Sequence, residues 1–435
     1  MRFKILAARL LIAQTVATLG TRSLLFSCLA LAAHAIPPHV ALLKDGLAAA
    51  KAGDTDTAIT KLEAAAKLRP DYPRIQLNLA RLYARAERTD DSVAALQRLA
   101  GMGVAVAATM DPTLAPLQEV PPFQTVFAQL AAPRAQVGDV SATSLDGVTG
   151  ILEGPLVDSK TGAWYFGDVR NRCIWRHRDG DMLRRFTADA DELDGVFKLA
   201  LSADGSVLWA STAAVGVMTG AAAEDGSRSA LVAFDFATGR VRSVHSVPTD
   251  GRKHLLGDFL LTADGAAFAT DTLSPVIWHL SPGGKTLEPW LESDDFLNLQ
   301  GLAFSPDGKV LYVADYANGV WRIDVATKEK SLLVAPPNAT FFGIDGIYAV
   351  PSGLLAIQNG VNPQRVLLIS PATGAEPSPA RVIVAGHPAM TDLALGTVDG
   401  NQFRFIADSG WALFDPEPAT PPAPRTVTVY SIAIR

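Results

Sequence analysis

From residue 140 onward, the chain alternates short apolar runs with clusters of glycine, aspartate and proline. One kind of turn recurs there: two apolar runs flank a pair such as Asp-Gly or Ser-Gly. This is typical of a β-hairpin, because glycine readily adopts the positive φ that the turn needs. The turn glycines are spaced 43, 60, 43, 45 and 47 residues apart, at Gly162, Gly205, Gly265, Gly308, Gly353 and Gly400. The longest interval contains a Gly/Ala-rich stretch, 213–229, which we expect to be a loop.

A second β-rich hairpin follows each turn, as in Cys173-Ile-Trp-Arg and Gly319-Val-Trp-Arg-Ile. Six units of about 45 residues, each with four strands, predict an all-β six-bladed β-propeller over residues 137–435. A sandwich shows no such period, and the four-strand rhythm disfavours a barrel or a β-helix. Because the sixth unit ends soon after its third strand, we expect residues 137–144 to supply its outer strand and close the ring.

Residues 40–103 are rich in alanine and leucine and repeat at an interval of 34 residues, so that Gly46 matches Ala80 and Leu62 matches Leu96. This resembles the tetratricopeptide repeat, with small residues where two helices cross. We therefore predict a small all-α tetratricopeptide-like domain over 36–110, with a capping helix and linker over 111–136. Such a module binds a peptide in its concave face or packs on the next domain as a spacer.

The first 35 residues have the pattern of a signal peptide. Four basic residues precede an apolar stretch, 24–33, which ends in Ala33-His34-Ala35, an A-x-A-like cleavage signature. A membrane anchor is the alternative, but the apolar stretch is shorter than the ~20 residues that span a bilayer. We expect cleavage, a periplasmic or secreted protein, and no stable membrane span afterwards. Of the two cysteines, Cys28 and Cys173, only the second would remain.

The composition is that of a folded protein, with 49% hydrophobic and 19% charged residues. The formal charge of −6 and the lack of a Lys/Arg-rich run argue against nucleic acid as a partner. The partners we expect are therefore a small-molecule substrate or ligand and a protein that binds the helical repeats.

Positions that match by repeat lie at one level around the central channel of a propeller. Eight or nine residues before the turn glycines stand Glu153, Phe197, Gly257, Gln300, Asp345 and Asp392. This set is more polar than a buried inner strand usually is, and its oxygens suit a hard cation. A second set, six to eight residues after the glycines, is Asp168, Ser211, Asp271, Asp315, Asn359 and Asp408. For its aspartates we favour a role as caps of the turns that follow the strands.

Three motifs in 140–435 resemble the regucalcin/gluconolactonase (senescence marker protein) family: Leu152-Glu-Gly-Pro-Leu-Val-Asp158, Gly301-Leu-Ala-Phe-Ser-Pro-Asp-Gly308 and Ile344-Asp-Gly-Ile347. The resemblance implies a six-bladed propeller that holds a divalent metal at the channel mouth and hydrolyses lactones. It implies metal ligands at Glu153 and Asp345, with Asp345 handling the proton of the attacking water. Two positions depart from the family: its asparagine before Gly-Leu-Ala is Gln300 here, and its Asn-Asp in the third blade is Gly257-Asp258.

Two functions stay open on these residues. The first is a metal-dependent lactone or ester hydrolase, with calcium the most suitable cation, metal ligands Glu153, Gln300, Asp345 and Asp392, and Asp345 as base. Asp258, His254 and Asn359 are candidates for binding the substrate, although strand alternation predicts that Asp258 faces away from the position of Gly257. The second function is a non-catalytic extracytoplasmic binding or scaffold protein that uses the propeller and the helical repeats.

Overall fold

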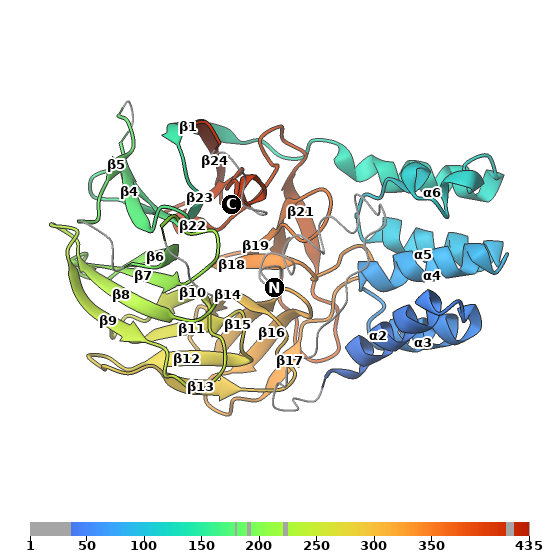
Figure 1. Ribbon diagram of the computed structural model, residues 1–435, viewed down its shortest axis with the longest axis horizontal. Coiled ribbons are helices and arrows are strands. Elements are labelled where there is room, and N and C mark those ends of the chain that lie inside the picture. The colour runs from blue at the N-terminus through green and yellow to red at the C-terminus, as the bar shows by residue number, and fades with distance from the viewer. Residues whose placement is uncertain (1–35, 179–180, 189–192, 221–224, 415–421, 435) are drawn as a thin grey trace.

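The structure is a computed structural model that describes residues 36–178, 181–188, 193–220, 225–414 and 422–434. It consists of a β-propeller with a helical domain beside it (Figure 1). The signal peptide predicted over residues 1–35 lies outside the described residues. None of the described helices is both long enough and apolar enough to cross a lipid bilayer.

The helical domain contains two helical hairpins and a further helix. Its α-helices are α2 (Pro38–Lys51), α3 (Thr55–Leu68), α4 (Pro73–Arg85), α5 (Thr89–Gly101) and α6 (Pro121–Ala131). The 34-residue repeat is visible in the starts of α3 and α5, and Asp54 caps α3 by accepting a hydrogen bond from the Thr57 N–H at 3.0 Å. Two short 3-10 turns, Ala108–Met110 and Ala115–Leu117, precede α6, which begins at Pro121 because proline fits the first helical turn.

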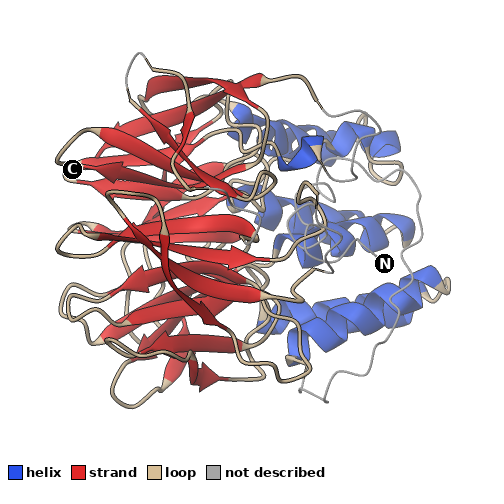
Figure 2. Cartoon of the chain, turned by 60° about the vertical axis from the view of Figure 1, so that its left-hand side comes forward, coloured by secondary structure: helices blue, strands red, loops and turns tan. Residues whose placement is uncertain are grey.

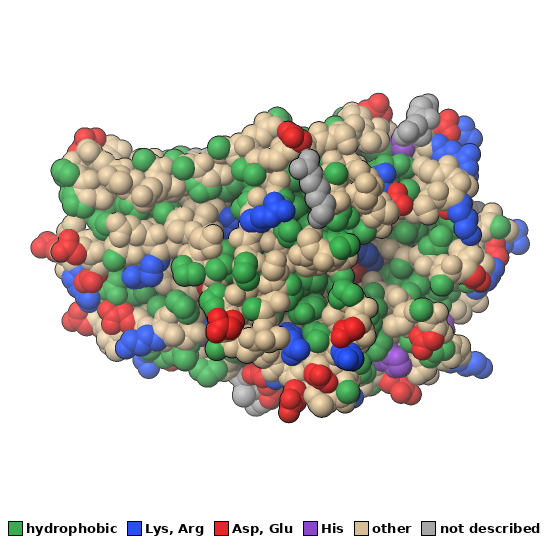
Figure 3. All heavy atoms as spheres, turned by 180° about the vertical axis from the view of Figure 1, so that it is seen from behind, with side chains coloured by type: hydrophobic (Ala, Val, Ile, Leu, Met, Phe, Trp, Pro, Cys, Tyr) green, Lys and Arg blue, Asp and Glu red, His purple; other side chains and the backbone are tan. Residues whose placement is uncertain are grey.

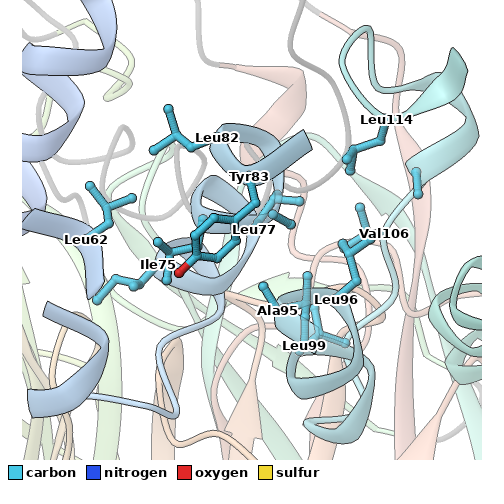
Figure 4. Close-up of a cluster of buried hydrophobic side chains, with 14 of the residues drawn as sticks. Leu62, Ile75, Leu77, Leu82, Tyr83, Ala95, Leu96, Leu99, Val106 and Leu114 are labelled. Atoms are coloured by element: carbon cyan, nitrogen blue, oxygen red, sulfur yellow. The ribbon is translucent and has the colours of Figure 1, made fainter. Parts of the chain in front are cut away.

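The helices are held by one apolar core. Gly46 lies where α2 crosses α3, and a side chain there would collide with Leu62. Figure 4 shows Leu62 facing Ile75 and Tyr83 of α4, while Leu96 lies on α5. These side chains are all buried. The core continues onto the propeller, because Phe342 and Val361 belong to the same cluster.

The propeller has six antiparallel sheets of four strands. Blade 1 contains β2 (Leu152–Asp158), β3 (Ala163–Asp168), β4 (Cys173–His177) and β5 (Arg184–Arg185). Blade 2 contains β6 (Gly195–Leu201), β7 (Val207–Ala213), β8 (Ser229–Asp235) and β9 (Val241–Ser246). Blade 3 contains β10 (Leu256–Leu261), β11 (Ala267–Asp271), β12 (Val276–Leu280) and β13 (Glu288–Glu292). Blade 4 contains β14 (Leu299–Phe304), β15 (Val310–Asp315), β16 (Gly319–Asp324) and β17 (Lys330–Leu332). Blade 5 contains β18 (Ile344–Val350), β19 (Gly353–Gln358), β20 (Arg365–Ile369) and β21 (Ala380–Ala385). Blade 6 contains β22 (Gly396–Asp399), β23 (Gln402–Ile406), β24 (Arg425–Ala433) and β1 (Ser141–Val148).

The ring closes as the sequence predicts, with a shifted boundary. The outer strand of blade 6 is β1, which pairs with β24 and spans Ser141–Val148 rather than 137–144. Val137 instead bridges Ala385 on β21, so the linker first adds to blade 5. His387 also holds the linker, because its Nε2 lies 3.0 Å from the Val137 carbonyl oxygen. Closure joins the start of the propeller to its last blade, and β1 covers the outer edge of β24.

Five of the six inner strands carry an irregularity at the same level. The pairing of each inner strand with its neighbour shifts register nine residues before the turn glycine, at Glu153, Val196, Leu256, Leu299 and Ile344. Such a β-bulge adds a residue to one strand, and the in-and-out alternation of side chains changes beyond it. At the level of the candidate residues, the side chains of these inner strands therefore do not alternate regularly between the two faces of the sheet.

The helical domain packs on one end of the propeller strands (Figure 2). The Tyr72 and Phe342 rings stack with centroids 3.9 Å apart. Arg69 donates to the Asn318 carbonyl oxygen at 2.7 Å. Arg365, buried on β20, donates to the carbonyl oxygens of Met102 and Gly103 at 3.1 and 2.7 Å. The domains thus share an interface of aromatic packing and buried hydrogen bonds.

Candidate functional site

The candidate ligands lie on inner strands near the end of the propeller that the helical domain covers. Glu153 is on β2, Gln300 on β14 and Asp345 on β18, and their exposed fractions are 0%, 2% and 0%. Phe342, which stacks on Tyr72, precedes Asp345 by three residues. The site is therefore a buried polar cluster beneath loops.

Asp345 is paired with Asn359, a member of the second repeat set. The Asn359 Nδ2 donates to Asp345 Oδ2 at 2.8 Å and to the Leu393 carbonyl oxygen at 2.9 Å. The amide oxygen of Asn359, which is 93% buried, has no hydrogen-bond partner among the described residues. Since a buried acceptor without a donor costs about 1–3 kcal/mol, this oxygen is suited to accept a hydrogen bond from a ligand.

Gln300 and Gly257 are neighbours, and the two departures from the family pattern meet in space. A Cβ atom at Gly257 would lie 3.4 Å from the Gln300 Oε1. The longer glutamine side chain thus extends toward the space that a side chain at position 257 would enter. Its Nε2 donates to Asn298 Oδ1 at 2.8 Å, which leaves Oε1 as the end directed at this space.

Glu153 is held by Trp411, which lies in the loop between β23 and β24. The indole Nε1 donates to Glu153 Oε1 at 2.6 Å. Trp411 belongs to an apolar cluster with Phe197, Met218, Leu255 and Phe414 that covers the ends of blades 1, 2, 3 and 6. This loop cluster and the helical domain cover the same end of the channel from two sides.

Asp392 lies in contact with the loop that carries Trp411. Its Oδ2 accepts from the Ser409 hydroxyl and from the Trp411 backbone N–H, both at 2.7 Å. It is only half-buried, and its backbone bridges Asp408. Its carboxylate therefore organises the loop that carries Trp411, and Trp411 in turn contacts Glu153.

The aspartates of the second set hold turns together, as the sequence predicts. Asp168, Asp271 and Asp315 each end a second strand and accept a backbone N–H from the turn that follows it. Each also accepts a backbone N–H from the loop before the inner strand. Each also accepts an indole N–H from the third strand, from Trp175, Trp278 and Trp321. This repeated arrangement ties three strands of a blade together.

His254 lies between two carboxylates of blade 3. Its Nδ1 is 2.6 Å from Asp271 Oδ2 and its Nε2 is 2.9 Å from Asp250 Oδ1. Burial lowers the pKa of His254, but hydrogen bonds and charges from Asp271 and Asp250 outweigh it and raise that pKa above its ordinary value. Both ring nitrogens are thus engaged in a turn, and the described contacts do not bring His254 to Glu153, Gln300 or Asp345.

Asp258 faces the channel, contrary to the expectation from strand alternation, because the bulge at Gly257 changes the alternation. Its Oδ1 lies 3.6 Å from the Lys198 Nζ of β6, and it is 2% exposed. Burial raises the pKa of Asp258 to about 6, and the charge of Asp345 acts in the same direction. The ammonium of Lys198 and the Phe259 N–H oppose this rise.

Lys198 and Tyr348 are the residues that sequence reasoning missed. The Lys198 Nζ lies 4.8 Å from the centroid of the Tyr348 ring and 3.4 Å from the Gly396 carbonyl oxygen. Burial raises the pKa of the Tyr348 hydroxyl well above its usual range, and so do the charges of Asp258, Asp345 and Glu153. The sequence does indicate Lys198 as a candidate, because it is the one charged residue in the inner strand Gly195–Leu201.

The side-chain oxygens at this site are of the types that bind a hard divalent cation. Glu153, Gln300 and Asp345 offer carboxylate and amide oxygens, which calcium prefers. With Asp258 and Lys198 added, three carboxylates and one ammonium carry a formal charge of −2 when all are ionised. Among the described residues, no three His, Cys, Asp or Glu side chains are grouped to hold a metal, so the Gln300 amide would be needed.

Comparisons with known proteins agree with this architecture. The model of the family described as "SMP-30/Gluconolactonase/LRE-like region" matches residues 151–384, and a tetratricopeptide repeat model matches residues 49–103. No curated protein matches the chain.

Several solved structures are similar to the propeller. A gluconolactonase from Xanthomonas campestris has 17% identity and a TM-score of 0.47, covering 69% of this chain and 92% of its own. A luciferin-regenerating enzyme has 16% identity and a TM-score of 0.42, covering 67% and 95%. Virginiamycin B lyase from Staphylococcus aureus has 13% identity and a TM-score of 0.42, covering 68% and 100%.

Proposed function

Since the chain belongs to the SMP-30/gluconolactonase/LRE-like family, we propose that it hydrolyses a lactone or a related small ester at the covered end of its channel. The observation that carries this proposal is the burial of Glu153, Asp258 and Asp345, each at most 2% exposed, with the unpartnered amide oxygen of Asn359 next to Asp345. Buried carboxylates are costly to keep in a fold, and such clusters occur most often at functional sites.

In this proposal Glu153, Gln300 and Asp345 hold a divalent cation, with calcium preferred for oxygen donors. When bound, the cation supplies Lewis acidity that polarises the ester carbonyl. Asp345 takes a proton from water as the water oxygen bonds to the acyl carbon, and returns it to the ring oxygen as the C–O bond breaks. Asn359 holds Asp345 through Nδ2, and its buried amide oxygen accepts a hydrogen bond from a substrate hydroxyl.

The test combines cation binding with turnover. The purified protein is treated with chelator, and its melting temperature is measured with added Ca²⁺, Mn²⁺ or Zn²⁺ before a panel of lactones is assayed. Asp345→Asn and Glu153→Gln are expected to lose the cation-dependent rise in melting temperature and most of the turnover. Asp158→Asn is the matched control, because Asp158 lies on the same strand as Glu153 but at its opposite end. Cation-independent melting of the parent protein together with no turnover on the panel would refute the proposal.

Ligand binding without turnover is the second candidate, favoured by the 0% exposure of Glu153 and Asp345 beneath the Trp411 loop and the helical domain. A sugar-like ligand would then be held by Asn359 and the carboxylates. Ligand-dependent stabilisation with no lactone turnover, lost in Asn359→Ala, would distinguish this function from hydrolysis.

Two further parts of the proposal concern location and partner. We propose that the chain is exported to the periplasm or secreted, which a fusion of residues 1–35 to a reporter active only outside the cytoplasm tests. For the helical repeats we propose binding of a protein segment on the surface that the propeller does not cover. Recovery of the same partners by a chain lacking residues 36–131 would contradict that role.

A further inference from the structure

The side chain of Lys198 lies inside the channel, although its strand belongs to a single blade. Its Nζ is 3.6 Å from Asp258 Oδ1 on blade 3, 4.8 Å from the Tyr348 ring on blade 5 and 3.4 Å from the Gly396 carbonyl oxygen on blade 6. One amine can reach three other inner strands only if it lies near the axis. The side chain is 12% exposed, so the charge is largely removed from water.

The contacts of Lys198 are those that offset a desolvated ammonium. A carboxylate provides opposite charge, a carbonyl oxygen accepts a hydrogen bond, and the face of an aromatic ring attracts a cation. Tyr348 is itself fixed, because the Gly396 N–H donates to its hydroxyl oxygen at 2.7 Å. Lys198 is thus held in one place by three blades.

This amine lies among the carboxylates assigned above to cation binding. The charges of Lys198 and Asp345 both affect the pKa of Asp258. The charges of Asp258, Asp345 and Glu153 all raise the pKa of Tyr348. The charge of Lys198 therefore acts on Asp258, whose own charge interacts with that of Asp345. Blade 3 offers Gly257 where the family pattern has a side-chain ligand, and the next residue, Asp258, is turned inward toward the amine.

We propose that Lys198 is a built-in counter-ion that pairs with Asp258, removes this carboxylate from the ligand set and so determines how strongly the cluster binds a divalent cation. Lys198 and Asp258 are positioning residues in this inference, and the ligands remain Glu153, Gln300 and Asp345. The inference rests on the proposed function for its cation, but the Lys198–Asp258 pair exists without one.

The experiment is a double-mutant cycle on the full chain with Lys198→Met, Asp258→Asn and the double variant. Calorimetric titration with Ca²⁺ measures affinity. Lys198→Met leaves Asp258 without its counter-ion, and the affinity is expected to rise by at least about tenfold. Asp258→Asn leaves the ammonium without its partner, and the affinity is expected to fall by a similar factor. The double variant is expected to return close to the parent affinity. Equal affinities in all four proteins, or no recovery in the double variant, would overturn the inference.

A second readout separates this inference from the proposed function. The melting temperatures of the same four proteins are measured in chelator, where no divalent cation contributes. Lys198→Met leaves the carboxylate without its counter-ion and is expected to melt below the parent. The double variant is expected to melt above the temperature that the two single shifts predict if they add. If Ca²⁺ binds to none of the proteins but this coupling is present, the cation site is refuted and the ion pair is supported. If the two shifts simply add, the ion pair is refuted whatever the cation does.

Discussion

The ring of Tyr72 in the helical domain lies parallel to that of Phe342 in blade 5, with an interplanar angle of 8° and centroids 3.9 Å apart. Phe342 belongs to the loop that leads into β18, the strand of Asp345. The Arg69 guanidinium also lies over Phe342, 4.2 Å from the ring centroid. The helical domain therefore packs on a residue that lies three positions before Asp345 of the candidate site.

Loss of this stacking should uncouple the two domains. Tyr72→Ala removes a buried aromatic ring, which costs about 3–5 kcal/mol in a well-packed core. We expect calorimetry to show the helical domain unfolding before the propeller, instead of one joint transition. The control is Tyr83→Phe, which loses a hydroxyl contact to Glu63 inside the helical domain and keeps the interface. A single transition at the parent temperature in Tyr72→Ala would contradict the coupling.

Arg365 should be the most sensitive charged residue of the interface. Burial lowers its pKa to about 10, and it donates to the Gln358 Oε1 at 2.6 Å as well as to Met102 and Gly103. Arg365→Met leaves three buried acceptors without this donor, so we expect the free energy of unfolding to fall by about 3 kcal/mol or more. Chemical denaturation measures this loss. Arg381→Met, on the exposed face of the neighbouring strand β21, should change it by less than about 0.5 kcal/mol.

Asp258 should give the stability a specific pH dependence in chelator. Its folded pKa of about 6 lies above the ~4 of an unfolded aspartate, so the folded protein holds the proton more tightly between these values. The contribution of Asp258 to stability is then fully present below about pH 4 and is lost as the pH rises through about 6. The expected loss is about 2–3 kcal/mol over this window. Denaturation from pH 4 to 7 should show this fall in the parent protein and a flatter profile in Asp258→Asn.

Trp411 should stabilise Glu153 through its indole N–H. Trp411→Phe keeps an aromatic ring beside Phe197 but removes the donor to Glu153 Oε1. Because hydrogen bonds to a charged group contribute about 1.5–3 kcal/mol, we expect a loss of that size in the free energy of unfolding. Trp290→Phe, at a half-buried position on β13, is the control. Equal losses in the two variants would show that ring size, and not the Glu153 contact, matters.

Much of the fold could be predicted because its repeats are local. Turn glycines such as Gly265 and Gly308 require positive φ and mark each hairpin without knowledge of the rest of the chain. The ring closure was also predictable, since blade 6 needed a strand, but its boundary was not. Val137 pairs with blade 5 before β1 begins at Ser141, and only the path of the linker over the propeller determines this.

The candidate site was less accessible to sequence reasoning. Register counting placed Glu153, Gln300 and Asp345 at one level, and each is the second residue of an inner strand. Counting could not show that a bulge at Gly257 turns Asp258 inward, because a bulge depends on pairing with the neighbouring strand. Nor could it assign Asp392 to the Trp411 loop, since that contact joins two turns.

The amino-acid sequence by itself determined the number of blades, the helical repeat and the acidic character of the channel level. These follow from local turn chemistry, hydrophobic period and residue type, which act over a few positions of the chain. Only the tertiary structure decided that Lys198 reaches Asp258 and Tyr348 across the channel, and that Tyr72 rests on Phe342. Both contacts join residues far apart in sequence, and their geometry is set by how blades and helices pack rather than by any local pattern.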